Sequence, residues 1–297
     1  MTRLWMVLWL FFFVAACFSA EEYAPVQTQV TDVRVYKPEQ YLFATGARIS
    51  NQLACYNLTL TQSKSDGSKP PQLSLTLDAG KFGFGPLVHF FKLRINGIDM
   101  RQLFTKAEDL LPWREKEQAG CVLKLNFDGV RFLLRLYLRP DSPVLWGSLQ
   151  LADNSLEKLS DGDIEFTLIP SKLAMRGKQS VWQGEYARMV LTPVRLLEQT
   201  PQRIVLNPSD EYLIFQDRKF DGSTEEKGQG PCMIIMDYRG IEKATLRIND
   251  DWTSALYLKI KTENFKEFRF GLWQQEPRIS NAEFARKIEA EKTAFKP

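Results

Sequence analysis

The stretch CVLKLNFDGVRFLLRLYL, residues 121–138, decides the fold. Apolar and polar residues alternate on both sides of Asp128-Gly129, a dipeptide that favours a two-residue turn with positive φ at both positions. Such a turn predicts three apolar pairs across a hairpin: Phe127 with Val130, Leu125 with Phe132, and Leu123 with Leu134. A slip of one residue would expose this whole apolar face, so the register is strongly specified.

The same alternation continues along the chain on both sides of this hairpin. Asn96-Gly97 predicts a second hairpin, in which Ile95 faces Ile98 and Arg94 faces the oppositely charged Asp99. Further strands are expected near residues 143–151, 163–169, 202–206, 212–216, 231–238, 241–248, 252–260 and 266–273.

Helical periodicity is found only near the C-terminus, over residues 280–296. Ser280 with Glu283 resembles a capping box. Phe284, Ile288 and Phe295 then lie along one stripe, surrounded by charged residues, which is typical of a helix that packs on a sheet.

These patterns indicate an all-β protein, a large antiparallel β-sandwich of two packed sheets with a short C-terminal α-helix. We expect one sandwich domain over residues 21–278. The polar stretch at residues 154–163 is the best internal boundary if the chain instead holds two domains.

The N-terminus has the form of an export signal. Arg3 precedes 13 apolar residues, Leu4 to Ala16, too few for a membrane-spanning helix of about 20. Val14-Ala15-Ala16-Cys17 resembles the bacterial lipobox, which implies a signal peptide over residues 1–16 and lipidation of Cys17. The alternative is ordinary cleavage after residue 19 or 20. The protein is therefore expected to be periplasmic, secreted or anchored to a membrane by lipid.

Composition limits the partners and cofactors. The formal net charge of +3 is small for 297 residues, so nucleic acid is not an expected partner. Cys121 and Cys232 both fall on apolar faces, which favours two buried thiols over a disulfide between them. His89 is the only histidine, and no Cys/His spacing suits zinc, so neither a metal nor a cofactor is expected, although carboxylates could still hold a hard cation.

A basic strand face supplies the first candidate binding site. Arg131, Arg135, Tyr137 and Arg139 have even spacing and therefore share one side of their strand. Arginine forks bind carboxylate and sulfate, and tyrosine offers a flat surface to a sugar ring. The hypothesis is a groove for an acidic glycan, to which Lys124, Lys92, Arg94 and Arg101 are candidate additions. The alternative is a solvated face whose charges pair with acids elsewhere.

The second candidate site is a loop that gathers aromatic and charged residues. Within 13 residues it holds Arg176, Lys178, Trp182, Glu185, Tyr186 and Arg188. Trp182 and Tyr186 can stack on sugars, and Glu185 can orient a hydroxyl or act as an acid. The alternative is that these aromatic residues belong to the core.

Other motifs favour structural interpretations. His89 shares the apolar face of its strand, and the glycine-rich residues 80–85 lack the Lys-Ser/Thr ending of a phosphate loop. The loop at residues 217–230 departs from a calcium-binding loop at Lys219 and Gly228. No Gly-x-Ser-x-Gly elbow is present, and no catalytic residue is nominated.

The function expected from the sequence is therefore an exported bacterial cell-envelope protein that binds a carbohydrate or a protein partner without catalysis. A glycan-active enzyme on a large sandwich, whether a lyase, a hydrolase or a mutarotase-like protein, is one alternative. A purely structural envelope component is another.

Overall fold

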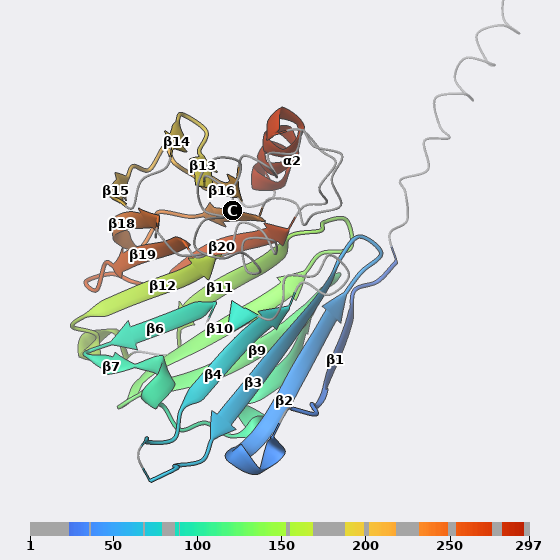
Figure 1. Cartoon of the computed structure of the whole chain (residues 1–297), viewed down its shortest axis with the longest axis vertical. Helices are drawn as coiled ribbons and strands as arrows, with labels where there is room; N and C mark the ends of the chain where they lie inside the picture. The colour runs from blue at the N-terminus through green and yellow to red at the C-terminus, as the bar shows by residue number, and fades with distance from the viewer. Residues whose placement is uncertain are drawn as a thin grey trace, which may run out of the picture.

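The computed structural model describes residues 24–35, 37–67, 69–78, 87–88, 90–152, 155–168, 188–198, 202–217, 232–248, 254–274 and 281–293. In this part of the chain, three antiparallel sheets form two layers, with the five- and six-stranded sheets in front of the nine-stranded sheet (Figure 1). The predicted all-β sandwich is confirmed.

The front layer contains the first seven strands and four later ones. The five-stranded sheet has the order β1 (Gln27–Asp32), β2 (Tyr41–Ser50), β3 (Cys55–Ser63), β4 (Leu73–Asp78) and β5 (Leu87–Val88). The six-stranded sheet has the order β15 (Gln202–Leu206), β18 (Ile241–Ile248), β19 (Ser254–Ile260), β12 (Gly162–Leu168), β6 (Phe91–Ile95) and β7 (Ile98–Asp99).

The back layer is the nine-stranded sheet. Its order is β14 (Leu196–Glu198), β13 (Arg188–Leu191), β16 (Tyr212–Asp217), β17 (Cys232–Met236), β20 (Glu267–Gln274), β11 (Leu145–Leu151), β10 (Val130–Leu138), β9 (Gln118–Phe127) and β8 (Leu110–Glu115). The last strand, β20, thus lies in the middle of the sheet, between β17 and β11.

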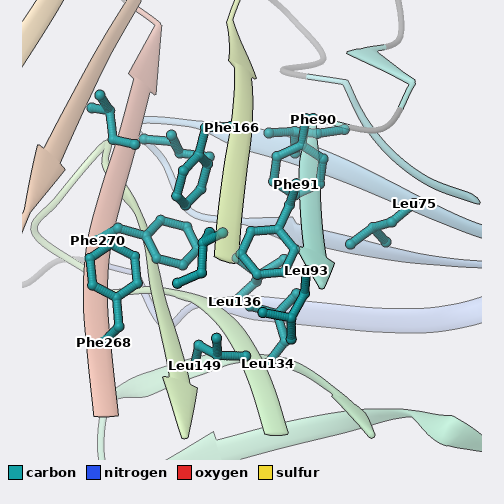
Figure 2. Packing of buried hydrophobic residues seen from close by; sticks show 14 of the residues in the cluster. Leu75, Phe90, Phe91, Leu93, Leu134, Leu136, Leu149, Phe166, Phe268 and Phe270 are labelled. Carbon is teal, nitrogen blue, oxygen red and sulfur yellow. The ribbon is translucent and has the colours of Figure 1, made fainter. Parts of the chain in front are cut away.

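Phenylalanine rings join the two layers. Phe166 of β12 meets Phe270 of β20 edge to face at 4.8 Å between ring centres, and Phe91 of β6 meets Phe166 at 5.4 Å (Figure 2). Opposite Phe270, the neighbouring strand carries Gly147, where an added Cβ would lie 2.2 Å from the ring. Burial of each such ring contributes about 1.5–3 kcal/mol, so these contacts are a main source of stability.

Both predicted hairpins form with the expected register. Asn96 and Asp128 each have φ 50°, followed by Gly97 and Gly129 at φ 84° and 88°. The three predicted apolar pairs of the second hairpin are present, as are both pairs of the first. Arg94 and Asp99 therefore place opposite charges across the first hairpin, as predicted, although Arg94 forms its ion pair with Asp163 on β12 and Asp99 with Arg101.

The C-terminal helix, α2, extends from Asn281 to Thr293 (Figure 1). Phe284 and Ile288 of the predicted stripe are fully buried and contact residues of β11, β16, β17 and β20 in a second, smaller core. The Phe284 ring meets Trp273 at 4.9 Å between centres. The helix therefore covers part of the back face of the nine-stranded sheet. Ser280 and Phe295 lie outside the described residues.

The cysteines behave as the alternation predicts. Cys121 on β9 and Cys232 on β17 are buried thiols that form no disulfide in the described part of the chain, and burial raises the pKa of each thiol to about 12. Among the described residues, none forms a helix long and apolar enough to span a membrane. The predicted signal peptide and Cys17 lie in residues 1–23, outside the described part.

Candidate functional site

The back face of the nine-stranded sheet, which points away from the core, carries the candidate site. Along β10, Phe132, Leu134 and Leu136 are buried against the front layer. The residues between them, including Arg135 and Tyr137, therefore point outward and are half-buried. The predicted basic face is thus the outer face of β10.

A row of residues crosses this outer face at right angles to the strands. Trp113 of β8 lies opposite Gly120 of β9, which lies opposite Tyr137 of β10, which lies opposite Trp146 of β11. The rings of Trp113 and Tyr137 come within 5.3 Å of each other between centres, tilted by 55°. We call these two side chains the aromatic platform.

Gly120 makes the platform possible. A Cβ at this position would lie 2.0 Å from the carbonyl oxygen of Leu136 and 2.5 Å from the Cα of Tyr137. Both are backbone atoms, which cannot give way as the end of a flexible side chain would. Without a side chain between them, the rings on the two flanking strands meet over β9.

Arg135 borders the platform. Its guanidinium carbon lies 5.5 Å from the centre of the Trp113 ring, a cation–π arrangement. Within the described ranges no carboxylate forms an ion pair with Arg135. This arginine therefore leaves its donors available to a ligand beside the aromatic rings.

A second row runs parallel to the first on the same face, two residues further along each strand. In it Arg135 lies opposite Ser148 of β11, and Ser148 lies opposite Arg269 of β20. Ser148 is only 4% exposed. Arg269 binds Glu267 on its own strand at 2.6 Å, and Glu267 also accepts a hydrogen bond from Gln150. Two arginines thus flank one small buried residue.

The hydroxyl of Tyr137 lies in the field of these charges. Burial raises the pKa of Tyr137, and Glu267 adds to the increase, whereas the charges of Arg269, Arg139 and Arg135 oppose it. The phenol is therefore a neutral donor and acceptor at neutral pH, positioned among cations.

The other predicted members of the basic face have different surroundings. The side chain of Arg139 is 19% exposed. It binds Asp141, two residues further along the chain, and Glu291 on α2, and its guanidinium lies over Trp146. It fastens the helix to the sheet. Arg131 and Lys124 are exposed on the same face, further from the platform along the strands.

The prediction that residues near the first hairpin extend this basic face is wrong. Lys92 and Arg94 belong to the six-stranded sheet, where they bind Glu165 at 2.7 Å and Asp163 at 2.6 Å on β12. Arg101 binds Asp99 at 2.7 Å. These are the charge pairs of a solvated sheet surface, the alternative interpretation of that pattern.

The loop candidates are not located by the structure. Arg176, Lys178, Trp182, Glu185 and Tyr186 lie outside the described residues, and of Arg188 only the backbone is described, at the start of β13. The other motifs outside the described residues are His89, the glycine-rich residues 80–85 and residues 218–230 of the acidic loop. In the described ranges, no three His, Cys, Asp or Glu side chains gather as a metal site would require.

Two residues that the sequence interpretation missed are central to the site: Trp113 and Arg269. Trp113 lies on edge strand β8, which contains Pro112 and joins β9 through a turn with Lys116 at φ 53°. Proline is tolerated on an edge strand, and this turn has no glycine signal. Leu111 and Trp113 are two residues apart, so they share one face of a strand. This alternation was the one local signal that could have predicted β8.

No protein-family model matches this chain, and no curated protein matches its sequence. Among solved structures, alpha-N-acetylgalactosaminidase NagBb from Bifidobacterium bifidum aligns with 91% of it. The ligand-free structure gives a TM-score of 0.49 at 6% identity, and the complex with GalNAc gives 0.48 at 7%. This chain spans 38% of the length of that protein. No residue role is transferred from this similarity.

Proposed function

We propose that this protein is an exported component of a bacterial cell envelope that binds carbohydrate on the outer face of its nine-stranded sheet, without catalysis. The aromatic platform is the observation that carries the proposal. Trp113 and Tyr137 are half-buried aromatic rings on an outer sheet face, where most large apolar side chains would instead face the core.

The chemistry of the platform suits a sugar. One face of a pyranose ring presents mainly C–H groups, which carry a slight positive charge and pack against the negative face of an aromatic ring. The sugar hydroxyls point outward from the ring edge, where the donors of Arg135 and the hydroxyl of Tyr137 can bind them. An aromatic surface bordered by fixed polar groups is the usual composition of a small-ligand site.

The location belongs to the proposal as well. The apolar residues 4–16 support export, and Val14-Ala15-Ala16-Cys17 supports a lipid anchor at Cys17. The intact mass of the mature protein tests this part. A diacyl or triacyl species that begins at Cys17 is expected, and an unmodified chain that begins at Ala20 or Glu21 would contradict the anchor.

Carbohydrate binding is tested on an array of envelope and plant polysaccharides, followed by calorimetry with the best binder. Trp113→Ala should abolish binding, and Trp113→Phe should retain part of it. Phe104→Ala is the matched control, because Phe104 is 68% exposed but lies outside the platform. Equal binding by Trp113→Ala and the unmodified protein, or no binding to any polysaccharide, would overturn the proposal.

The rival activity, a glycan-active enzyme, is distinguished in the same experiment. The bound polysaccharide is incubated with the protein, and its chain length and reducing ends are followed over time. An unchanged polymer is expected. Release of shorter products that depends on Trp113 would show that the platform serves an enzyme.

A further inference from the structure

We infer that the outer face selects sugars that carry a negative charge, a carboxylate or a sulfate, and that Arg135 and Arg269 hold the charged group. This inference rests on the proposed carbohydrate binding, and it adds the class of ligand. The proposed set of arginines differs from the set predicted from the sequence, because it includes Arg269 and excludes Arg139.

The two arginines are placed to act on one ligand. Arg135 and Arg269 occupy the same row of the same face, with only Ser148 on the strand between them. Neighbouring strands are about 4.8 Å apart, so the two backbone positions are separated by about 10 Å. Long arginine side chains from such positions can reach one anionic group, or two groups on adjacent sugars, and each fork can bind it through two donors.

The charges in this row do not cancel. Arg269 has Glu267 as its partner, whereas Arg135 forms no ion pair with any carboxylate of the described residues. The carboxylate of Glu267 also accepts a hydrogen bond from Gln150. One positive charge is therefore left beside the platform, and it is only partly exposed to solvent.

The front layer provides an internal comparison. On its six-stranded sheet, Lys92, Arg94 and Lys259 each bind a carboxylate on a neighbouring strand or on the turn before it. Each of these three cations is thus neutralised by a carboxylate of the same surface. The surroundings of Arg135 are aromatic instead, with Trp113 5.5 Å from its guanidinium.

The position of the charge relative to the platform limits the ligand. The guanidinium of Arg135 lies over the Trp113 ring, so an anion bound there belongs to a sugar on the platform or to its immediate neighbour. Tyr137 completes the site, because its hydroxyl can donate to the same anion. A free small anion would use the arginines alone and would not depend on Trp113.

The test compares polymers that differ only in charge. Polygalacturonate is paired with its methyl ester, and dextran sulfate with dextran, so the two pairs distinguish carboxylate from sulfate. The unmodified protein should bind at least one acidic polymer about tenfold more tightly than its neutral partner. Arg135→Gln and Arg269→Gln should each remove most of that preference while the neutral polymer still binds. The preference should weaken as salt is added.

Three controls make the outcomes decisive. Arg247→Gln removes one exposed positive charge from the six-stranded sheet, so it separates local recognition from net charge. Arg135→Lys keeps the charge but lacks the fork, and thermal unfolding of each variant verifies folding. Unchanged preference in Arg135→Gln and Arg269→Gln, or an equal loss in Arg247→Gln, overturns the inference. If Trp113→Ala still removes binding in that case, the proposed function stands without it.

Discussion

The guanidinium of Arg135 lies over the ring of Trp113, 5.5 Å from its centre, although β9 separates the strands of the two residues. The contact exists because Gly120, the residue of β9 between Trp113 and Tyr137, has no side chain. A glycine, a tryptophan and an arginine on three strands thus form one surface. Its parts should be energetically coupled.

Coupling between Arg135 and Trp113 is the first prediction. A double-mutant cycle with Arg135→Ala and Trp113→Ala, measured by urea unfolding, should give an interaction free energy of about 0.5–1 kcal/mol, the range for a partly exposed cation–π contact. Strictly additive effects of the two substitutions would show that the contact does not stabilise the folded protein.

Gly120→Ala should destabilise the protein by about 1–3 kcal/mol, because the new Cβ would strike the backbone of β10. Gly162→Ala is the matched control. There the nearest atom, 2.9 Å away, is the end of the flexible side chain of Ile260, which can move. The smaller loss is expected for Gly162→Ala in thermal or urea unfolding, and the reverse order would contradict the role assigned to Gly120.

Asn96 should contribute more to the free energy of unfolding than its position in the turn alone explains. Asn96 and Asp128 occupy equivalent positions with the same φ of 50°, but Asn96 also donates to the carbonyl of Lys158 and accepts from Ser160 and Asp161. Asn96→Ala should therefore cost about 1–2 kcal/mol more than Asp128→Ala in the free energy of unfolding. Equal losses would mean that these hydrogen bonds contribute no net stability.

Glu291 should make stability depend on pH. Its burial on the side of α2 that faces Ser142 and Arg139 raises its pKa above the ordinary 4.5, although these two residues act in the opposite direction. The folded state therefore keeps a proton that the unfolded state releases, and the free energy of unfolding falls as pH rises above 4.5 toward the raised pKa. Glu291→Gln should remove this decline in urea unfolding across that range.

The control for this prediction is Glu289→Gln, which removes a carboxylate from the exposed side of the same helix. It should keep the decline with pH that the unmodified protein shows. A decline that persists unchanged in Glu291→Gln would assign the dependence to another group.

Local patterns predicted the strands and hairpins because each depends on residues close in sequence. Asp128-Gly129 determines its turn, and the alternation around it determines which residues are buried. The candidate site was only half predicted for the same reason. Arg135 and Tyr137 share a strand, so their spacing placed them on one face.

The other half of the site depends on which strands become neighbours. Ser148 and Arg269 are opposite each other only because β20 pairs with β11, a long-range choice that no local pattern encodes. Trp113 was missed for a different reason: Pro112 and a turn without glycine gave β8 no clear strand or hairpin signal. For Arg94 the register was right, but β12 on its other side supplied a better partner, Asp163.

The central position of β20 has a consequence for the order in which the back layer can assemble. β8 to β11 form one group of paired strands, β13, β14, β16 and β17 form another, and β20 alone pairs with both groups. Until residues 267–274 have emerged, the back layer consists of two separate ribbons whose exposed edges lack a shared partner. A chain truncated before residue 267 should therefore fail to join these two groups of strands into one sheet.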